Sequence, residues 1–349
     1  MASSSSSSSS SSIEGDQEID RQLIEAAFAD DVELGGRLLA AGACVDTLFV
    51  DKDEYSNNSN NSNNSNNNSN NNNSSSSSVR DGEMRVSLLL KVVQSRQTRF
   101  LKLLLENGAN VHCKDNWGRT PLVVASSIGS LDIVKHLLSH GASVHDKAYF
   151  GTTPLFCSSI SGHLSIVEEL LKQGANVHDK LNNGDSSLFV ACREGHLSIV
   201  QLLLNSGGNV FDEDEYGRTP LWAASWKGDV EIASLLLSHG ANVHCFAETH
   251  LSSLSVAASW NQREVVSLLL AHGARLNDRD EAGRTPIMIA QELSHGFIVD
   301  NLQNWPLAMV FLCLSNLSVF VDVESMIDLF EYIGWCNCKQ VCTCGLIIA

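Results

Sequence analysis

Four thiols near the C-terminus are the side chains whose type and spacing could bind a metal. The motif CNCKQVCTC places them within nine residues, at Cys336, Cys338, Cys342 and Cys344. Four thiolates suit zinc, but structural zinc sites usually separate their ligand pairs by a longer segment, so these intervals would strain one tetrahedral site. We expect an exposed, reduced tail over residues 336–349 instead. Oxidation or lipidation of the four thiols stays an open alternative.

Histidines recur at one position of a repeated pattern. They are His112, His145, His178 and His244. Neighbouring units of such a pattern would lie about 10 Å apart, the usual distance between packed helices, so this column could not share one ion. The sequence therefore predicts surface or loop histidines, and neither a metal site nor a cofactor.

Catalytic motifs are missing from the sequence. It contains no phosphate loop of the Gly-Lys-Ser/Thr type, no dinucleotide fingerprint, no Gly-x-Ser-x-Gly and no His-Glu-x-x-His. Repetition also distributes similar residues along a ladder, whereas catalysis needs different residues that converge on one pocket. We therefore predict no catalytic residues and no enzyme activity.

The charge balance limits the classes of partner. The chain has 349 residues with a net charge of −17, and it shows no cluster of Lys or Arg. DNA, RNA and acidic lipid surfaces are bound chiefly through such clusters, so we expect neither a nucleic-acid partner nor a membrane partner. Residues 13–55 are the most acidic segment, and we interpret them as a solvated face.

The start of the chain and its scattered cysteines set the expected location. Met-Ala-Ser followed by polyserine lacks the basic residues and the apolar stretch of a secretory signal. Six of the ten cysteines occur singly, as is typical of reduced core residues. We expect a monomer in the cytoplasm or the nucleus, with residues 1–17 as a disordered Ser-rich tail.

The strongest signal is an internal repeat with a fixed period. The unit GRTPLVVASSIGSLDIVKHLLSHGASVH of residues 118–145 recurs with related sequence up to residue 244. Thr120 and Pro121 predict a helix start, because a hydroxyl can accept free backbone N–H groups and proline needs no partner there. The same point in the other units is marked, without insertion or deletion, by Thr153, Ser186, Thr219, Ser252 and Thr285.

Each unit predicts two helices. The second helix presents one apolar face, formed in the unit of residues 118–145 by Ile133, Val134, Leu137 and Leu138. Gly141 can end this helix because glycine adopts the left-handed conformation at low cost. A unit with one apolar face cannot bury that face alone, so the units must stack as a solenoid. Small residues in the first helix allow close approach: Ala125, Ser158, Ala191, Ala224, Ala257 and Ala290.

This pattern resembles the ankyrin repeat, since the period, the Thr-Pro-Leu start, the apolar face and the Gly-Ala end all match. The resemblance implies an all-α solenoid of paired antiparallel helices, with hairpin-like loops that project at right angles and a concave binding surface. One departure is visible at the histidine expected after Thr-Pro-Leu. It is replaced by Val123, Phe156, Phe189 and Trp222.

Repeat phase places the Ser/Asn tract of residues 56–78 inside the array. Gly42 and Gly108 hold equivalent positions and lie two full periods apart. We predict about eight units over residues 18–304, interrupted by a disordered insert at residues 47–79. The stack can re-form beyond the insert because lengthening a flexible surface loop costs little closure entropy.

Residues 305–335 follow the array and carry two candidate helices. We predict that they form a helical cap on the last unit. Two alternatives stay open. One is a membrane-tethering segment, since no charge occurs between Asp300 and Asp322. The other is a ubiquitin-ligase-recruiting helical box, for which the similarity to the suppressor-of-cytokine-signalling box is distant.

The sequence thus predicts a non-catalytic scaffold that binds a protein partner, whose identity it does not name. In ankyrin arrays partners usually meet the hairpin tips and the inner helix. At those positions this chain is rich in aromatic residues and arginine, the types that dominate interface energetics. The predicted contacts are Trp117, Arg119, Tyr149, Phe150, Asn183, Asp185, Arg193, Glu194, Tyr216, Arg218, Trp226, Lys227 and Trp260.

Overall fold

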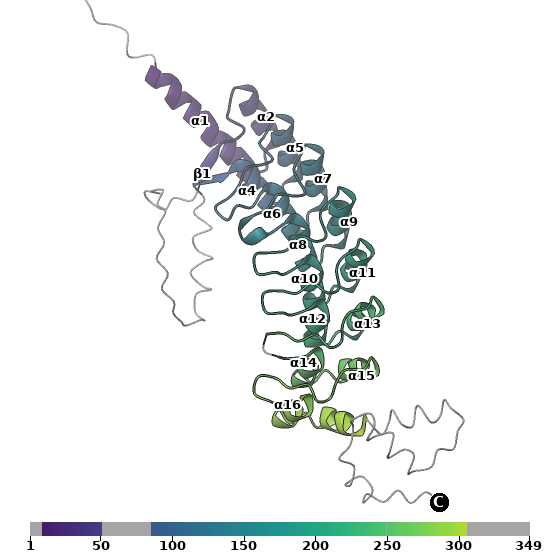
Figure 1. The fold of residues 1–349 in the computed structure, drawn as a ribbon. Coiled ribbons are helices and arrows are strands. Elements are labelled where there is room, and N and C mark those ends of the chain that lie inside the picture. Colours follow the sequence, from purple (N-terminus) through teal and green to yellow (C-terminus); the bar gives the residue numbers. More distant parts are fainter. Residues whose placement is uncertain (1–8, 51–84, 249, 306–349) are drawn as a thin grey trace, which may run out of the picture.

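The computed structural model describes residues 9–50, 85–248 and 250–305, which form a curved stack of helix pairs (Figure 1). The first helices of successive pairs contact one another as an inner column: α4 (Leu88–Gln94), α6 (Pro121–Ile128), α8 (Pro154–Ile160), α10 (Ser187–Glu194), α12 (Pro220–Lys227), α14 (Ser253–Ser259) and α16 (Pro286–Glu292). The second helices form an outer column: α5 (Thr98–Glu106), α7 (Leu131–Ser139), α9 (Leu164–Lys172), α11 (Leu197–Asn205), α13 (Val230–Ser238) and α15 (Arg263–Ala271). The predicted all-α solenoid is confirmed.

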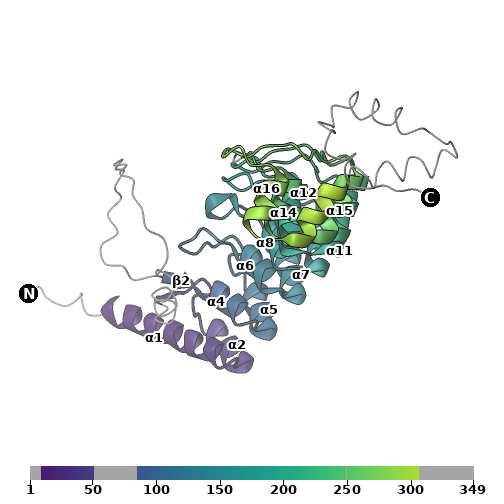
Figure 2. The ribbon, with the colours of Figure 1, turned by 90° about the horizontal axis from the view of Figure 1, so that it is seen from below.

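Loops join each pair to the next and project together along one side of the stack, as the end view shows (Figure 2). One of these loops contains the short 3-10 helix η1 (Tyr149–Gly151). The loops lie beside the inner column and opposite the outer helices (Figure 1). This edge of the stack therefore combines loop tips with inner helices, as the resemblance to the ankyrin repeat implied.

Hydroxyl side chains begin several inner helices. Thr153 accepts a hydrogen bond from the Phe156 N–H at 3.1 Å, and Ser186 accepts one from the Phe189 N–H at 3.2 Å. The prediction was wrong for Thr120 and Thr285, whose side chains accept no capping hydrogen bond although their backbones are extended, and the buried Thr120 Oγ1 has no partner at all. The helix after Thr120 still begins there, because Pro121 supplies a pre-set φ at its first position.

The core runs the length of the stack in two rows. In the inner row the six predicted small residues, from Ala125 to Ala290, are all fully buried. In the outer row Ile133, Val134 and Leu137 are buried, while Leu138 lies at the margin. The left-handed Gly141 (φ 89°) follows α7, so the predicted helix end is confirmed.

Side chains at the start of the outer helices also join neighbouring units. His163 Nε2 lies 3.1 Å from the carbonyl oxygen of Ser127, and His196 Nε2 lies 3.2 Å from that of Ile160. The imidazole of His163 covers Gly129, where an added Cβ would approach its Cε1 to 2.5 Å. Glycine is therefore required at this turn by both backbone conformation and the neighbouring ring.

The first unit stacks directly on the second despite the insert between them. It consists of α1 (Ser9–Phe28) and α2 (Val32–Ala40), which contact α4 and α5 respectively. The Gln97 side-chain amide also donates to the Ala27 carbonyl at 2.8 Å. The Ser/Asn tract therefore lies between two units that pack against each other.

Two boundaries differ from the prediction. The helix α1 begins at Ser9, inside the segment expected to be a disordered tail. The strand β1 (Leu48–Val50) lies within the expected insert of residues 47–79 and pairs antiparallel with β2 (Arg85–Ser87). The sequence could not predict this pairing, because the two strands lie on either side of residues 51–84 and show no periodic pattern. These two strands bring the ends of the insert together.

The described chain ends in a helix over residues 296–305, where Ile298 and Leu302 are buried against the array. The predicted cap from residue 306 onward, the two alternatives for that segment and the cysteine-rich tail lie outside the described residues. Within the described part of the chain, no helix combines the length and apolar character needed to cross a membrane.

Candidate functional site

The six described hairpins share one backbone closure. In each, the N–H of one residue donates to the carbonyl of the residue four positions later. The pairs and N–O distances are Asp115–Arg119 (3.1 Å), Ala148–Thr152 (2.9 Å), Leu181–Asp185 (2.9 Å), Asp214–Arg218 (3.2 Å), Ala247–Leu251 (3.2 Å) and Asp280–Arg284 (3.0 Å). The hairpin of residues 245–251, which lacks the glycine present in the other five, also forms this closure.

Backbone hydrogen bonds also connect neighbouring hairpin tips. The donor always belongs to the hairpin that follows the acceptor's hairpin, so the bonds form a ladder along the edge of the stack. They join Tyr149 N to Trp117 O (3.0 Å), Asn182 N to Phe150 O (2.8 Å), Glu215 N to Asn183 O (2.8 Å) and Glu248 N to Tyr216 O (2.7 Å). The predicted contact residues at the tips therefore project from an ordered edge.

Three hairpins carry an Asp–Arg side-chain pair at the closure, and we call them paired hairpins: residues 113–119, 212–218 and 278–284. Arg119 Nε lies 2.6 Å from Asp115 Oδ2, and the same bond in the other two hairpins measures 2.6 and 2.8 Å. In Asp280 desolvation opposes ionisation, but the hydrogen bonds and charge of Arg284 prevail and lower the pKa of that carboxyl.

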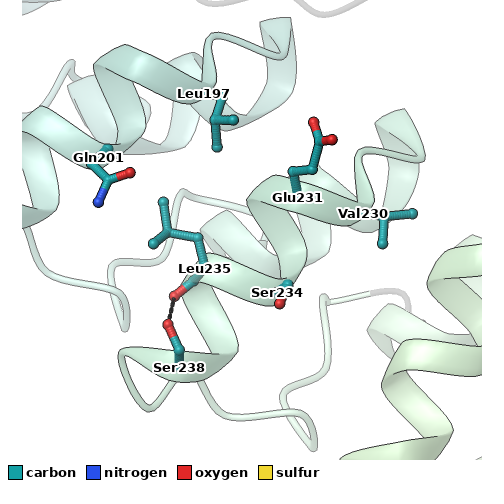
Figure 3. Close-up of a pocket in the computed structure, with 7 residues that line it drawn as sticks. All are labelled: Leu197, Gln201, Val230, Glu231, Ser234, Leu235 and Ser238. Carbon is teal, nitrogen blue, oxygen red and sulfur yellow. Dashed lines mark hydrogen bonds between the residues drawn. The ribbon is translucent and has the colours of Figure 1, made fainter.

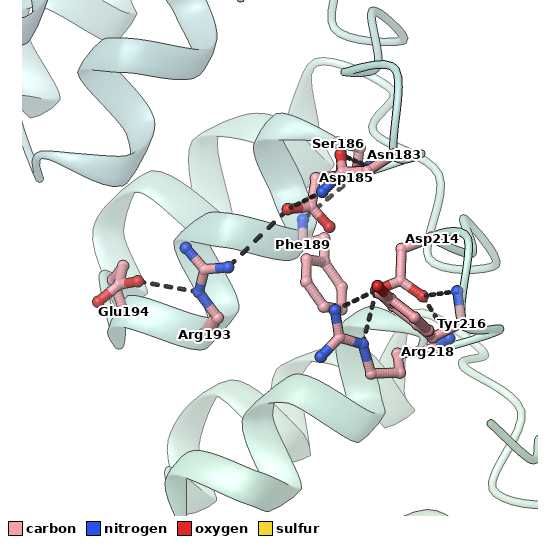
Figure 4. A network of polar contacts seen from close by, with 9 residues as sticks. All are labelled: Asn183, Asp185, Ser186, Phe189, Arg193, Glu194, Asp214, Tyr216 and Arg218. Carbon is pink, nitrogen blue, oxygen red and sulfur yellow. Dashed lines mark hydrogen bonds and ion pairs between the residues drawn. The ribbon is translucent and has the colours of Figure 1, made fainter. Parts of the chain in front are cut away.

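The arginines of two paired hairpins lie over aromatic rings. Arg119 Cζ is 4.5 Å from the centre of the Trp117 ring. Arg218 Cζ lies 4.9 Å from the Tyr216 ring and 5.5 Å from those of Phe189 and Trp222. The guanidinium therefore ties the tip of this hairpin to the inner helices α10 and α12 (Figure 4).

The other three hairpins, residues 146–152, 179–185 and 245–251, lack this pair, and we call them unpaired hairpins. In the middle one, Asp185 stands where the paired hairpins have arginine. It is only 5% exposed, so the prediction of an exposed contact residue is wrong there. Burial raises the pKa of its carboxyl against the opposing effects of Asn183 and Arg193.

Asp185 has only a partial set of partners (Figure 4). Its Oδ2 accepts from Asn183 Nδ2 at 3.3 Å and lies 3.8 Å from Arg193 Nη1, whereas its buried Oδ1 has no partner. Arg193 is itself shared, since its Nε donates to Glu194 Oε1 at 2.9 Å. The negative charge of Asp185 is thus balanced incompletely within the described part of the chain.

Four predicted aromatic residues are exposed along the edge. The exposed fractions are 60% for Tyr149, 74% for Phe150, 50% for Tyr216 and 56% for Trp260. Phe150 also has a positive φ of 62°, a conformation that is costly for a bulky residue. This tip therefore holds a large apolar side chain in a strained and fully projecting position.

The remaining predicted residues are arranged in smaller groups. Trp226 and Trp260 meet edge to face with ring centres 5.6 Å apart, and Lys227 beside them is exposed. Trp117, Asn183 and Trp226 are half-buried, so each contributes part of its surface. The structure thus places the thirteen predicted residues on the hairpins and on the inner helices or their ends, but does not gather them into a single pocket.

The sequence did not identify Trp222 as a member of this surface, nor the buried Phe189 as a ring beneath Arg218, although both replace the histidine expected in the repeat. Trp222 is half-exposed, and its indole Nε1 is buried without a hydrogen-bond partner. The aromatic replacement at a fixed repeat position was the available signal, because it placed large rings in the inner column beside the hairpins.

A shallow groove of about 490 Å³ lies elsewhere, between the outer helices α11 and α13 (Figure 3). Leu197, Val230 and Leu235 supply its apolar wall, and Ser238 Oγ donates to the Leu235 carbonyl at 2.7 Å. In the described residues, no group of three or more His, Cys, Asp or Glu could hold a metal ion. The groove contains no set of groups suited to acid–base chemistry.

Comparison with known families agrees with this geometry. A sequence model described as ankyrin repeats in three copies matches residues 88–180 and 166–247, and a model of the single ankyrin repeat matches residues 250–281. A search of curated proteins finds no significant match. The family matches cover the stack from α4 to α15 and include the hairpins that carry the predicted contact residues.

Proposed function

The chain belongs to the ankyrin-repeat family, whose repeats form a protein–protein interaction module, and we propose that it is a non-catalytic scaffold that binds a protein partner on its concave edge. The proposed surface consists of the hairpin tips and the adjacent faces of the inner helices. Its thirteen residues are those predicted from the sequence. Asp185 is buried, so it contributes its charge but not a direct contact.

A single observation carries this proposal, namely the exposed aromatic residues on the hydrogen-bonded ladder. Tyr149, Phe150 and Tyr216 project from tips whose backbone is already held by neighbouring hairpins. Stacking of the repeats does not need the side chains of Phe150 and Tyr216, since the core rows are complete without them, whereas the Tyr149 ring also packs against Gly118 of the preceding hairpin. Rigid aromatic side chains lose little conformational entropy on binding, which makes them effective anchors in interfaces.

Strain at Phe150 supports the same surface. A positive φ costs a bulky residue on the order of 1–2 kcal/mol, and asparagine or glycine would avoid most of that cost. Such strain commonly occurs at functional positions. We infer that Phe150 is an anchor that inserts into a pocket of the partner.

The test is quantitative affinity purification from cell extract with the full chain as bait. We expect the triple variant Phe150→Ala, Tyr216→Ala and Trp260→Ala to lose at least about tenfold of the main captured protein, since buried aromatic anchors are each worth roughly 1–2 kcal/mol or more. The matched control is Phe211→Ala, which removes an aromatic side chain of similar exposure, 57%, outside the hairpin tips.

The two variants must keep the circular dichroism spectrum and melting temperature of the wild type. Full capture by a folded triple variant would contradict the proposed surface, and equal loss in the Phe211 variant would contradict its specificity. The proposal includes a monomer, which light scattering tests, and a cytoplasmic or nuclear location, which a fluorescent tag tests. Ligase recruitment and membrane tethering depend on residues 305–335 and stay hypotheses from the sequence.

A further inference from the structure

Charge is distributed unevenly between the two halves of the hairpin edge. The first three hairpins, residues 113–119, 146–152 and 179–185, contain four acidic and four basic residues. The next three, residues 212–218, 245–251 and 278–284, contain eight acidic residues against three arginines. We call these later hairpins, together with Trp226 and Trp260 on the neighbouring helices, the acidic edge.

The excess negative charge of the acidic edge is not used by the fold. Arg218 and Arg284 already pair with Asp214 and Asp280, and Lys180 pairs with Asp212 at 2.9 Å. Four glutamates remain without an ion pair inside the described part of the chain, and all are exposed: Glu213, Glu215, Glu248 and Glu281. Their mutual repulsion would be relieved by a cationic partner.

A buried acid at the border of the acidic edge points to the same partner. The unpartnered Oδ1 of Asp185 is buried and lies beside the Phe189 ring (Figure 4). Its nearest cation is Arg193, whose Nη1 is 3.8 Å from the other oxygen. Because charge is screened less in a protein interior than in water, this incompletely balanced carboxylate strengthens the negative potential above it.

One exposed aromatic ring lies among these acids, and a second stands at the end of an adjacent inner helix. Tyr216 is half exposed on the tip beside Glu215, and Trp260 projects from the end of α14 against Trp226. Tryptophan and tyrosine faces attract ammonium and guanidinium groups, and they also cover the aliphatic stems of lysine and arginine. The combination of exposed rings and unpaired carboxylates is complementary to a basic peptide and not to an acidic or purely apolar one.

We propose that the acidic edge binds an extended segment of the partner that is rich in lysine and arginine. This inference rests on the proposed scaffold function and gives the chemistry of the partner. The glutamates of successive tips bind the cationic groups of the lysine and arginine side chains, while Tyr216 and Trp260 cover the aliphatic stems of those side chains. The balanced charge of the first three hairpins restricts this contact to the later half of the edge.

The experiment uses the full chain and two fluorescein-labelled probes, a nine-residue peptide of alternating arginine and glycine and its glutamate counterpart. Fluorescence anisotropy at about 0.1 M salt should detect the arginine peptide and not the glutamate peptide. The triple variant Glu213→Gln, Glu215→Gln and Glu248→Gln should weaken its affinity about tenfold, as expected for the loss of three partly screened contacts. Trp260→Ala should give a loss of similar size.

The matched control changes the same number of charges on the outer helices. Glu168→Gln, Glu231→Gln and Glu264→Gln neutralise three exposed glutamates on α9, α13 and α15. This control should retain affinity within about twofold, because charges farther away than a Debye length of about 10 Å are largely screened. Equal losses in the two triple variants would assign binding to net charge and overturn the proposal.

Two further outcomes separate this inference from the proposed function. If the arginine peptide does not bind, but the Phe150, Tyr216 and Trp260 variant still loses its captured protein, the scaffold stands and the basic-segment inference fails. If that aromatic variant keeps its captured protein, the proposed surface itself fails. Preference for the glutamate peptide would also overturn the inference.

Discussion

Paired and unpaired hairpins occur along one edge, yet all six keep the same backbone closure. Asp214 N donates to Arg218 O at 3.2 Å in a paired hairpin, and Leu181 N donates to Asp185 O at 2.9 Å in an unpaired one. The side-chain pair is therefore not needed to form the loop. The hairpin backbone is specified instead by its closure and, in the first five hairpins, by the ladder to its neighbours.

The difference lies in what each hairpin presents. In the paired hairpin of residues 212–218, Arg218 is held over Tyr216 and occupies part of the ring surface. In the unpaired hairpin of residues 146–152, no arginine of the described chain lies over Phe150, which is the most exposed of the large apolar residues there. A hairpin without the Asp–Arg pair thus leaves its aromatic ring uncovered, whereas a hairpin with the pair presents a mixed aromatic and cationic surface.

The largest expected effect concerns the glycine of an unpaired hairpin. Gly184 has φ 82°, and an added Cβ would lie 2.8 Å from the Asp214 Cα of the next hairpin. We expect Gly184→Ala to lower the free energy of unfolding by about 3 kcal/mol, since the left-handed conformation alone costs on the order of 1–2 kcal/mol and the backbone contact adds to it. Urea unfolding followed by circular dichroism measures this loss.

Gly283 provides the matched control in a paired hairpin. Its φ is 73°, but an added Cβ would meet no atom within 4 Å. Gly283→Ala should therefore cost only about 1 kcal/mol, the conformational part of the effect. Equal losses at the two positions would show that contact between neighbouring hairpins is not what holds the edge together.

A smaller effect is expected from breaking the pair itself. The Asp214 carboxylate accepts the N–H groups of Tyr216 at 2.9 Å and Arg218 at 2.8 Å, besides binding the guanidinium. Asp214→Ala should destabilise the chain by about 2 kcal/mol, because donors that lose a partner in a part-buried site keep their desolvation cost. Differential scanning calorimetry checks the value, and the far-ultraviolet spectrum should not change.

Glu213→Ala is the control in the same hairpin, since this exposed residue forms no ion pair within the described residues. Its effect should stay within about 0.5 kcal/mol, as is usual for surface positions. A loss of the hairpin signal in the Asp214 variant, seen by amide hydrogen exchange, would refute the view that the backbone closure suffices.

The repeat predicted the elements of this edge because each element is specified by residues close together in the sequence, and these residues recur once in every unit. Helix starts such as Thr153, the buried alanine row and the glycine ends each depend on one position in a unit. The same reasoning placed the thirteen candidate residues on one side of the stack. It could not rank them, since exposure depends on neighbouring side chains that the repeat pattern does not fix.

The missed features all depend on partners that the period does not specify. Asp185 is buried because Asn183 and Arg193 close over it, although the equivalent Arg119 is part-exposed. The strand pair β1–β2 depends on two short segments on either side of the insert. The positive φ of Phe150 arises in a turn whose sequence, Tyr-Phe-Gly, differs from its equivalents.

The smallest expected effect tests what the unpaired acid does for stability. Burial raises the pKa of Asp185 from its ordinary value of 3.8, so the native state holds its proton more tightly than the unfolded state does. Between the two pKa values the native state binds more protons, and stability therefore falls as the pH rises through that interval. Above that pH interval, the charged Asp185 carboxylate lowers the stability of the native protein.

Asp185→Asn removes that cost while it keeps the size and shape of the side chain. We expect the variant and the wild type to be equally stable near pH 3, and the variant to be more stable near pH 7 by about 0.5–1 kcal/mol, at the low end of the range for single substitutions. Asp115→Asn should act in the opposite direction near pH 7, because this acid binds Arg119 at 2.6 Å in a paired hairpin. Urea unfolding at both pH values distinguishes the two. If Asp185→Asn is less stable than the wild type near pH 7, the attraction between Asp185 and Arg193 outweighs the desolvation cost of the carboxylate. Asp185 would then stabilise the fold as a partner of Arg193, and its charge would not be left unbalanced for a cationic ligand.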